Sequence, residues 1–534
     1  MRLISLLVCS LVAGVSLPAI AADEKVDLVL INKIRDEGTS RSKVMDTLSV
    51  LTDEIGPRLT GSPSLKKAGE WTQKQLTDWG LQNAQVENIG PFGRSWVLEK
   101  ASMRMVAPGN LELVAIPKAW TPGTDGLKRG KAVYAKLESE EDLAKWKGKL
   151  NGVILFRDAP IATPLHMTAD AKRYTEQDLH DIANMEFESG PARAPFDAAA
   201  FAKRQAFNKK LIPFLMEEKV LATVNVSRGD DGTIFVQGGG SYKAGEDTGP
   251  AAFVMSAEHY NRIYRLLEKK KDVMLEVESA VNFSDEDPAN SINVYAEIPG
   301  TDKKDEVVML GGHLDSWHAG TGATDNAAGV AVAMEAVRML KAIGFKPRRT
   351  IRIALWGGEE QGLLGSRFYV NKYVASRAES NDPADKDVPS FMRRNTNPLV
   401  YKPMHGKISA YFNLDNGGGK IRGIYAENNA AVKAIFDSWL APFHDLGAKT
   451  TTMKKTGSTD HVSFDAVGVP GFQFIQEPMD YFTRTHHTNI DVYDKVQKGD
   501  MMQASMIMAS FVAHAANRDD LLPRKPLPPE PAKR

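Results

Sequence analysis

The sequence contains almost no cysteine, since Cys9 is the only one among 534 residues. An internal disulfide framework is therefore excluded. The chain also lacks an excess of either charge, because 67 Lys and Arg residues balance 67 Asp and Glu residues. This balance gives no electrostatic signature of nucleic-acid or membrane-surface binding. No run of about 20 apolar residues could form a transmembrane helix, so we expect no stable membrane insertion.

The N-terminus has the pattern of a secretory signal. Arg2 precedes the mostly apolar residues 3–17, and the small residues at 19–22 suit a cleavage site. We expect cleavage after Ala21 or Ala22 and take residues 1–21 as a signal peptide. The mature protein would then contain no cysteine and would be periplasmic or secreted.

Two patterns divide the rest of the chain. After residue 290, apolar strands alternate with helices, which predicts an α/β fold with a mostly parallel sheet flanked by helices on both faces. The expected strands lie at 306–312, 350–356, 408–414 and 472–475, and the expected helices at 326–343, 428–440 and from about 498. Between about 113 and 283 the pattern changes to short strands, such as 130–135, 150–156, 222–226 and 233–236. They predict a separate, strand-rich module.

These patterns predict a divided domain organisation. Segments 22–112 and 284–520 would form one domain, with residues 113–283 inserted into it. Residues 521–534 form a proline-rich tail. The only histidines between 113 and 283 are His166, His180 and His259, without a comparable cluster of ligands. We therefore expect the insertion to shape access to a site and not to perform chemistry.

Several residues with metal-ligand chemistry stand at the ends of predicted elements. In the parallel sheet expected here, such positions gather at one edge. Each residue alone has an ordinary explanation, such as a helix cap, a loop start or a surface histidine pair. Together they offer the imidazole and carboxylate groups of a hydrolytic zinc site. The five candidate ligands are His313, Asp325, Glu360, Asp415 and His487.

The ordered motifs closely resemble a known family. His313-x-Asp315, Asp325, Glu359-Glu360, Asp415 and His487-Thr488-x-x-Asp491 resemble the co-catalytic zinc exopeptidases of metallopeptidase family 28. Gly457-Ser-Thr-Asp-His461 resembles the family's loop between the fourth and fifth ligands. The resemblance implies the zinc exopeptidase fold, with a protease-associated domain in the place of residues 113–283.

The resemblance also implies roles for individual residues. Two zinc ions per chain would share Asp325, with His313 and Asp415 completing one site and Glu360 and His487 the other. Glu359 would be the general base and acid, and Asp315 the partner of His313. Related enzymes often have an oxyanion-stabilising tyrosine directly before the last ligand, but His486 stands here. The oxyanion candidates are therefore His486 and Tyr481, and Arg484 is a candidate contact for a substrate carboxylate.

The implied function is hydrolysis of short peptides by a two-metal-activated water. The resemblance favours a carboxypeptidase or a dipeptidase and leaves an aminopeptidase open. A non-catalytic, receptor-like binding protein on the same fold is an alternative from another class, and a zinc amidohydrolase or cyclase is another. The complete ligand set argues against both. A short peptide is the expected partner, and the sequence leaves a homodimer open.

Overall fold

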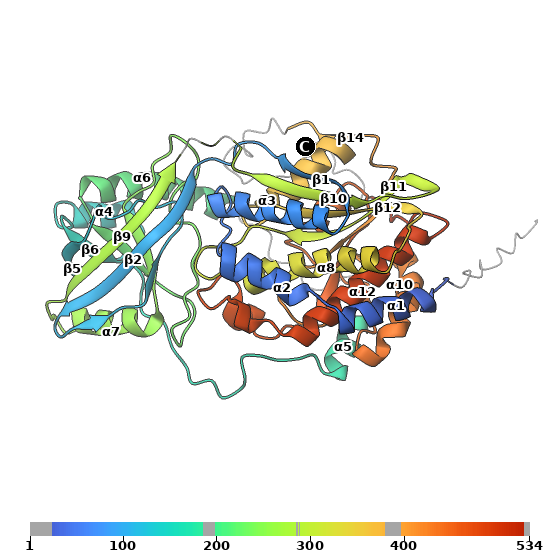
Figure 1. The fold of residues 1–534 in the computed structure, drawn as a ribbon. Helices are drawn as coiled ribbons and strands as arrows, with labels where there is room; N and C mark the ends of the chain where they lie inside the picture. The colour runs from blue at the N-terminus through green and yellow to red at the C-terminus, as the bar shows by residue number, and fades with distance from the viewer. Residues whose placement is uncertain (1–23, 185–197, 285–286, 288, 380–396, 528–534) are drawn as a thin grey trace, which may run out of the picture.

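A mixed sheet forms the centre of the larger part of the molecule (Figure 1). The computed structural model describes residues 24–184, 198–284, 287, 289–379 and 397–527. In spatial order the strands are β1 (Gln82–Asn88), β10 (Ile292–Ile298), β12 (Arg349–Trp356), β11 (Lys303–His313), β15 (Ile408–Asn413), β18 (Gly471–Gln476), β16 (Ile421–Tyr425) and β17 (Thr450–Thr452). The four strands from β12 to β18 are parallel neighbours, and antiparallel pairs flank them. The predicted α/β fold is confirmed.

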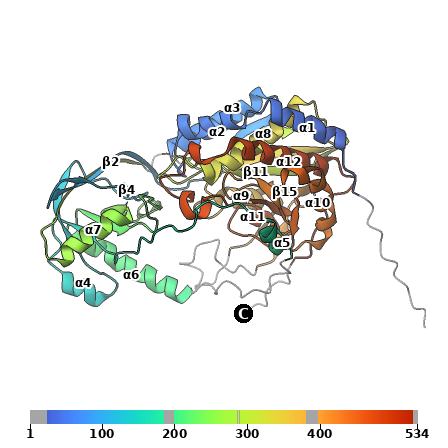
Figure 2. The same ribbon diagram turned by 90° about the horizontal axis from the view of Figure 1, so that it is seen from below.

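Helices cover both faces of this sheet, as Figure 2 shows for the strands β11 and β15. One face carries α1 (Leu28–Ser40), α2 (Val44–Ser49), α3 (Pro63–Asp78), α8 (Ala328–Ala342), α10 (Lys433–Leu440) and α12 (Lys498–Asn517). The other face carries α9 (Leu364–Tyr369) and α11 (His461–Asp465). Side chains of β11 alternate between the two cores: Val308 and Leu310 join the first, Val307 and Met309 the second. This two-sided burial explains the continuous apolar run at 307–310.

A second sheet lies beside the first (Figure 1). Its strands, in spatial order, are β3 (Leu111–Glu112), β2 (Ser95–Ala107), β9 (Met274–Ser284), β5 (Lys128–Tyr134), β6 (Val153–Phe156), β7 (Ala222–Val226), β8 (Ala251–Met255) and β4 (Ala115–Pro117). The helices α4 (Glu140–Trp146), α6 (Ala198–Glu217) and α7 (Ala257–Glu268) accompany it. We call residues 95–284 the second unit. The predicted insertion, residues 113–283, lies within this unit, and its boundaries stay a prediction.

One helix from this part of the chain lies away from its own sheet. Helix α5 (Glu176–Asn184) lies under the larger part of the molecule, against β17 (Figures 1 and 2). The segment leading to it is held by Lys172, which pairs with Met479, and by the backbone N–H of Tyr174, which donates to Glu477 at 2.6 Å. The second unit therefore contacts the larger part through more than one segment.

One predicted strand is absent from the described residues. Residues 233–236 join no sheet, and Phe235 instead forms an isolated bridge with Thr488 of the larger part. The prediction of a strand there is wrong because the partner is a distant loop and not a neighbouring strand. The expected signal peptide and residues 528–534 of the proline-rich tail lie outside the described residues. Within the described part, no helix combines the length and apolar character that crossing a bilayer requires.

Candidate metal centre

The candidate ligands come from one edge of the central sheet. His313 is the last residue of β11, Asp415 follows β15 by two residues, and Glu359 and Glu360 follow β12. These three strands are parallel neighbours, so their carboxyl ends deliver the side chains together. The other two ligands arrive from loops. Asp325 lies in the turn η2 (Ala323–Ala327) before α8, and His487 follows the turn η8 (Tyr481–Thr485).

The first group of ligands surrounds His313. Its Nε2 lies 3.2 Å from Asp325 Oδ1 and 3.2 Å from Asp415 Oδ1. Glu359 Oε2 lies 4.0 Å from the same nitrogen. All of these side chains are buried or nearly so. His313, Asp325 and Asp415 each offer one ligand atom within 4.8 Å of the others, which is the spacing of a shared cation.

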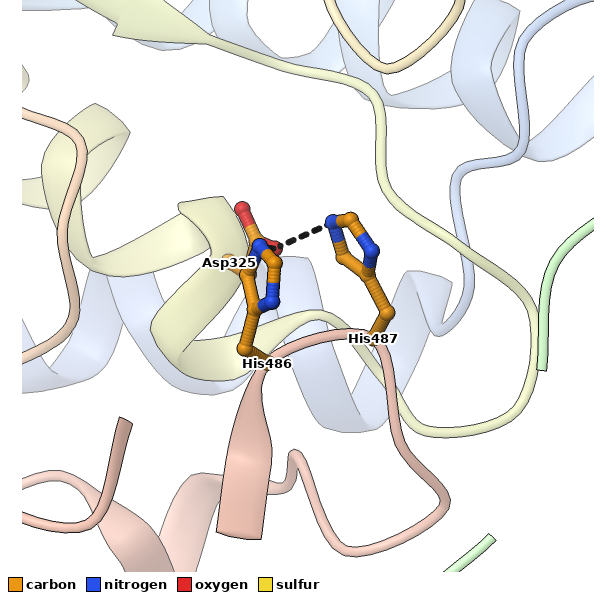
Figure 3. Close-up of side chains that lie close together, drawn as sticks. All are labelled: Asp325, His486 and His487. Atoms are coloured by element: carbon orange, nitrogen blue, oxygen red, sulfur yellow. Dashed lines mark ion pairs between the residues drawn. The ribbon is translucent and has the colours of Figure 1, made fainter. Parts of the chain in front are cut away.

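The second group surrounds His487 and uses the other oxygen of Asp325. His487 Nε2 lies 3.1 Å from Asp325 Oδ2 and 3.0 Å from Glu360 Oε2. Figure 3 shows His487 directed at Asp325, with His486 beside it on the same loop. The carboxylate of Asp325 therefore lies between two histidines and faces both groups.

The protein groups alone leave this centre unsatisfied, and a cation fits it. Asp325 Oδ2 and Glu360 Oε1 are buried without a hydrogen-bond partner among the described residues. Burial raises the pKa of Glu360 to about 7, although His487 opposes the shift. Burial also raises the pKa of Glu359 well above its usual range, and the nearby Asp415 adds to it. A cation favours the ionised form of such carboxyl groups, and imidazole with carboxylate suits zinc.

Asp315 fixes several parts of the centre at once. The ring nitrogen Nδ1 of His313 lies 3.0 Å from the backbone oxygen of Asp315 and 3.5 Å from its Oδ1. Asp315 Oδ1 accepts the backbone N–H of Glu359 at 3.1 Å, and Oδ2 accepts that of Glu360 at 3.3 Å. Thr60 donates to Oδ2 at 2.9 Å. The carbonyl of Asp315 thus orients His313, while its carboxylate anchors the glutamate pair.

Sequence reasoning assigned no role to Asp491, which orients Asp325, the candidate shared ligand. Its Oδ1 accepts the backbone N–H of Thr324 at 2.6 Å and the Thr324 hydroxyl at 2.7 Å. Its Oδ2 accepts the backbone N–H of Asp325 at 3.1 Å. Burial raises the pKa of Asp491 to about 7, and Asp325 adds to the shift. The motif His487-Thr488-x-x-Asp491 was the signal for this residue.

A second residue without an assigned role is Arg58. Its guanidinium is fully buried and donates to five backbone oxygens at 2.7–3.1 Å, those of Leu51, Gly56, Leu314, Thr321 and Gly322. Burial lowers the pKa of Arg58 to about 10, while Asp491, Asp315 and Asp325 oppose the shift. Arg58 thereby ties η1 (Val50–Ile55) and the loop after it to the segment between β11 and the turn that carries Asp325. No local sequence pattern indicated these contacts.

The two oxyanion candidates lie beside the ligands. The ring of His486 stacks on that of His487, with centroids 3.7 Å apart, and its Nε2 lies 3.9 Å from Asp325 Oδ2. Burial lowers the pKa of His486 to about 4, so its ring is neutral near pH 7. Tyr481 is buried with its ring centroid 5.0 Å from that of His486. Burial and the nearby carboxylates raise the pKa of Tyr481 well above its usual range, which keeps its hydroxyl protonated.

The predicted substrate contact Arg484 is engaged by the second unit. Its Nε donates to Asp170 at 2.7 Å, its Nη2 to Asp231 at 3.1 Å, and its Nη1 to the backbone oxygen of Asp230 at 3.0 Å. His166 lies between Asp170 and Asp230 at 2.6 and 2.9 Å. Three ligand-type residues, His166, Asp230 and Asp231, therefore lie together in this part of the chain, although they are far less buried than the central group. The cluster is largely exposed, and Arg484 neutralises much of its negative charge.

Comparisons with known proteins match part of the chain to a peptidase family. Residues 293–512 match the sequence model of Peptidase family M28. The chain is a metallopeptidase, and the segment that matches this family carries all five candidate ligands. Bovine carboxypeptidase Q is 24% identical over 492 residues, which cover 91% of this chain and 88% of that protein. The expected resemblance to this family, and within it to carboxypeptidase Q, is confirmed.

Solved structures support the fold. The chain resembles a Peptidase M28 precursor from Shewanella amazonensis with a TM-score of 0.64 and 24% identity, covering 94% of this chain and 98% of that one. It also resembles a zinc aminopeptidase from Bacillus subtilis with a TM-score of 0.52 and 17% identity, covering 89% and 95%. At these identities the likeness shows the architecture and leaves the choice of peptide terminus open.

Proposed function

We propose that this metallopeptidase is a zinc-dependent exopeptidase with two zinc ions per chain. His313, Asp325 and Asp415 would hold one ion, and Asp325, Glu360 and His487 the other. The shared carboxylate of Asp325, which approaches a histidine with each of its oxygens, carries this proposal. When bound, two zinc ions lower the pKa of a water molecule and polarise the carbonyl group of the scissile peptide bond.

Glu359 is the general base and acid of the proposed reaction. Its carboxylate is nearly buried and lies 4.0 Å from His313 of the first ligand group. It takes the proton of the attacking water and later delivers that proton to the leaving amine. Asp315 holds the backbone of Glu359 in place during both transfers. Tyr481 and His486 are the groups proposed to donate to the oxyanion, since both stay protonated or neutral beside the carboxylates.

An arginine of the second unit favours recognition of a substrate carboxylate. Arg228 stacks on Phe235 with its guanidinium carbon 3.3 Å from the ring centroid, and the Phe235 ring lies 5.7 Å from that of His487. Among the residues that the structure describes, no carboxylate forms an ion pair with Arg228, and its side chain is exposed. A substrate carboxylate near the centre needs such a cation. We therefore propose Arg228, in place of Arg484, as its contact and favour a carboxypeptidase or dipeptidase.

Metal analysis and a peptide panel test the proposal. The purified protein should contain about two zinc ions per chain, and strong chelation should abolish hydrolysis until zinc is returned. An N-acetylated dipeptide should remain a substrate, while the same dipeptide with a C-terminal amide should be cleaved poorly. Arg228→Gln should raise KM for the free-carboxylate substrate by about 10-fold, as expected for the loss of one charge-assisted contact.

Each part of the proposal has its own contrary result. Hydrolysis that survives strong chelation would contradict the proposed zinc mechanism. Preference for the amide over the N-acetylated peptide would make the protein an aminopeptidase. An unchanged KM in Arg228→Gln, with zinc still bound, would show that residues other than Arg228 determine which peptide terminus is recognised. Binding of peptides without any turnover would favour the receptor-like alternative.

We also propose that the protein is exported with residues 1–21 removed and acts on short peptides in the periplasm or outside the cell. The N-terminal pattern of Arg2, apolar residues 3–17 and small residues at 19–22 supports this proposal. Cell fractionation followed by sequencing of the mature N-terminus tests it. A full-length protein retained in the cytoplasm would contradict it.

A further inference from the structure

The loop that carries His487 is paired along its backbone with the second unit. The N–H of Val236 donates to the backbone oxygen of His487 at 3.2 Å, and the N–H of Asn489 donates to that of Ile234 at 3.2 Å. The side chain of Asn489 returns the contact, since its Oδ1 accepts the N–H of Ile234 at 2.6 Å. Residues 234–236 therefore act as a strand partner for residues 487–489, although neither segment belongs to a sheet.

A side chain of the same segment reaches the ligand ring itself. The amide nitrogen Nε2 of Gln237 lies 3.0 Å from His487 Nδ1, on the side of the ring opposite Asp325 and Glu360. The Phe235 ring lies on the same histidine, with ring centroids 5.7 Å apart. Gln237 and Phe235 thus limit rotation of the His487 ring from the second unit.

The chemistry of a histidine ligand gives this contact a defined direction. When an imidazole binds a metal through Nε2, its proton resides on Nδ1 and requires an acceptor. The amide group of Gln237 can present its oxygen to that proton by a rotation that exchanges its oxygen and nitrogen positions. For His313 the equivalent acceptor is the backbone oxygen of Asp315, within its own domain. The two ligand histidines therefore differ in which part of the chain supports them.

A separate contact anchors the turn that leads into this loop. Arg484 lies three residues before His487 and pairs with Asp170, Asp230 and Asp231 of the second unit. The side chain of Arg484 is mostly buried at this contact. The backbone pairing, the Gln237 amide and the Arg484 cluster all fix the same loop from the second unit.

We propose that Gln237 is a positioning residue that accepts the Nδ1 proton of His487, so that the second unit completes the metal centre. The inference rests on the proposed zinc function and adds to it. The zinc ion held by Glu360 and His487 depends on the second unit, whereas the ion held by His313 and Asp415 does not. The second unit therefore does more than shape access to the site.

Stepwise zinc competition with a chelating indicator tests the proposal in the full-length protein. Gln237→Leu removes the acceptor, Gln237→Glu retains one, and Gln177→Leu changes an exposed glutamine of α5 as the matched control. Loss of such an outer partner weakens metal binding by about 10–100-fold. We expect this weakening in Gln237→Leu and in neither of the other two variants, and for only one of the two zinc ions. At limiting zinc the kcat of Gln237→Leu should fall with little change in KM. Gln237→Glu should restore both the zinc affinity and kcat.

The outcomes separate this proposal from the zinc function on which it rests. A wild-type protein that binds no zinc would contradict both the zinc function and the role of Gln237. Two tightly bound ions in the wild type, together with unchanged constants in Gln237→Leu, would overturn the role of Gln237 alone. Equal weakening of both ions in Gln237→Leu, with a lowered urea midpoint of the chelated protein, would show general destabilisation and would also overturn it.

Discussion

Replacement of Asp315 by asparagine tests how the centre holds Glu359, the proposed general base. The carboxylate of Asp315 is fully buried and accepts hydrogen bonds through both oxygens. Oδ1 accepts the N–H of Glu359 and lies 3.5 Å from His313 Nδ1, whereas Oδ2 accepts both Thr60 and the N–H of Glu360. Asparagine offers one acceptor and one donor group. In its less costly orientation the amide oxygen stays with Thr60 and Glu360, and the amide nitrogen faces the N–H of Glu359.

The expected magnitude follows from this orientation. One charge-assisted hydrogen bond is lost, which costs about 1.5–3 kcal/mol, and the N–H of Glu359 is left without an acceptor. We expect the free energy of unfolding to fall by about 2–4 kcal/mol. Because the loss falls on the backbone of Glu359, kcat should decrease by about 10–100-fold even with zinc bound, while KM changes little.

Urea unfolding and steady-state kinetics at saturating zinc measure these two effects. Thr60→Val is the matched control, because it removes a donor to Oδ2 and leaves the contact with Glu359 intact. It should lower stability by about 1 kcal/mol and keep kcat within about threefold of the wild type. Wild-type kcat in a zinc-loaded Asp315→Asn protein would refute the reasoning, and so would equal losses of kcat in both variants.

Three further predictions concern the base, the buried arginine and acid stability. Glu359→Gln should retain zinc and its fold but lose about 10²–10⁴-fold in kcat, because an amide cannot accept the proton of the attacking water. Steady-state kinetics together with metal analysis would check this, and near-normal turnover would show that another group is the base. Arg58→Met should lower the free energy of unfolding by on the order of 4 kcal/mol, since five buried carbonyl contacts are lost. Arg58→Lys should recover only part of this stability. A loss below about 1 kcal/mol in urea unfolding of Arg58→Met would be inconsistent with these contacts. Burial lowers the pKa of His318 to about 4, so the folded protein keeps this ring neutral while the unfolded chain protonates it below about 6.5. Its contribution, about 3 kcal/mol, should be present above that pH and be lost as the pH falls from about 6.5 towards 4. Unfolding of His318→Asn should depend less on pH over that range, and identical pH profiles would argue against the shift.

The order of elements and the clustering of the candidate ligands could be predicted because both depend on local patterns. His313, Asp415 and the glutamate pair each follow an apolar segment that is long enough to be recognised as a strand. Parallel neighbouring strands bring their carboxyl ends to one edge, so the alternation of strands and helices was sufficient to place these residues together. The same logic failed at residues 233–236, where an apolar segment pairs with residues 487–489 and not with a strand.

The sequence by itself determined the α/β fold, the resemblance to a peptidase family and which side chains gather at the sheet edge, since periodicity and ordered motifs are properties of neighbouring residues. Only the tertiary structure decided how that edge is supported. Arg58 contacts residues up to 264 positions away, and Gln237 contacts His487 across 250 positions. Arg484 pairs with the second unit, whereas Arg228 has no acidic partner among the described residues. Such contacts depend on how two units pack and on which way a long side chain turns, and no local pattern encodes either.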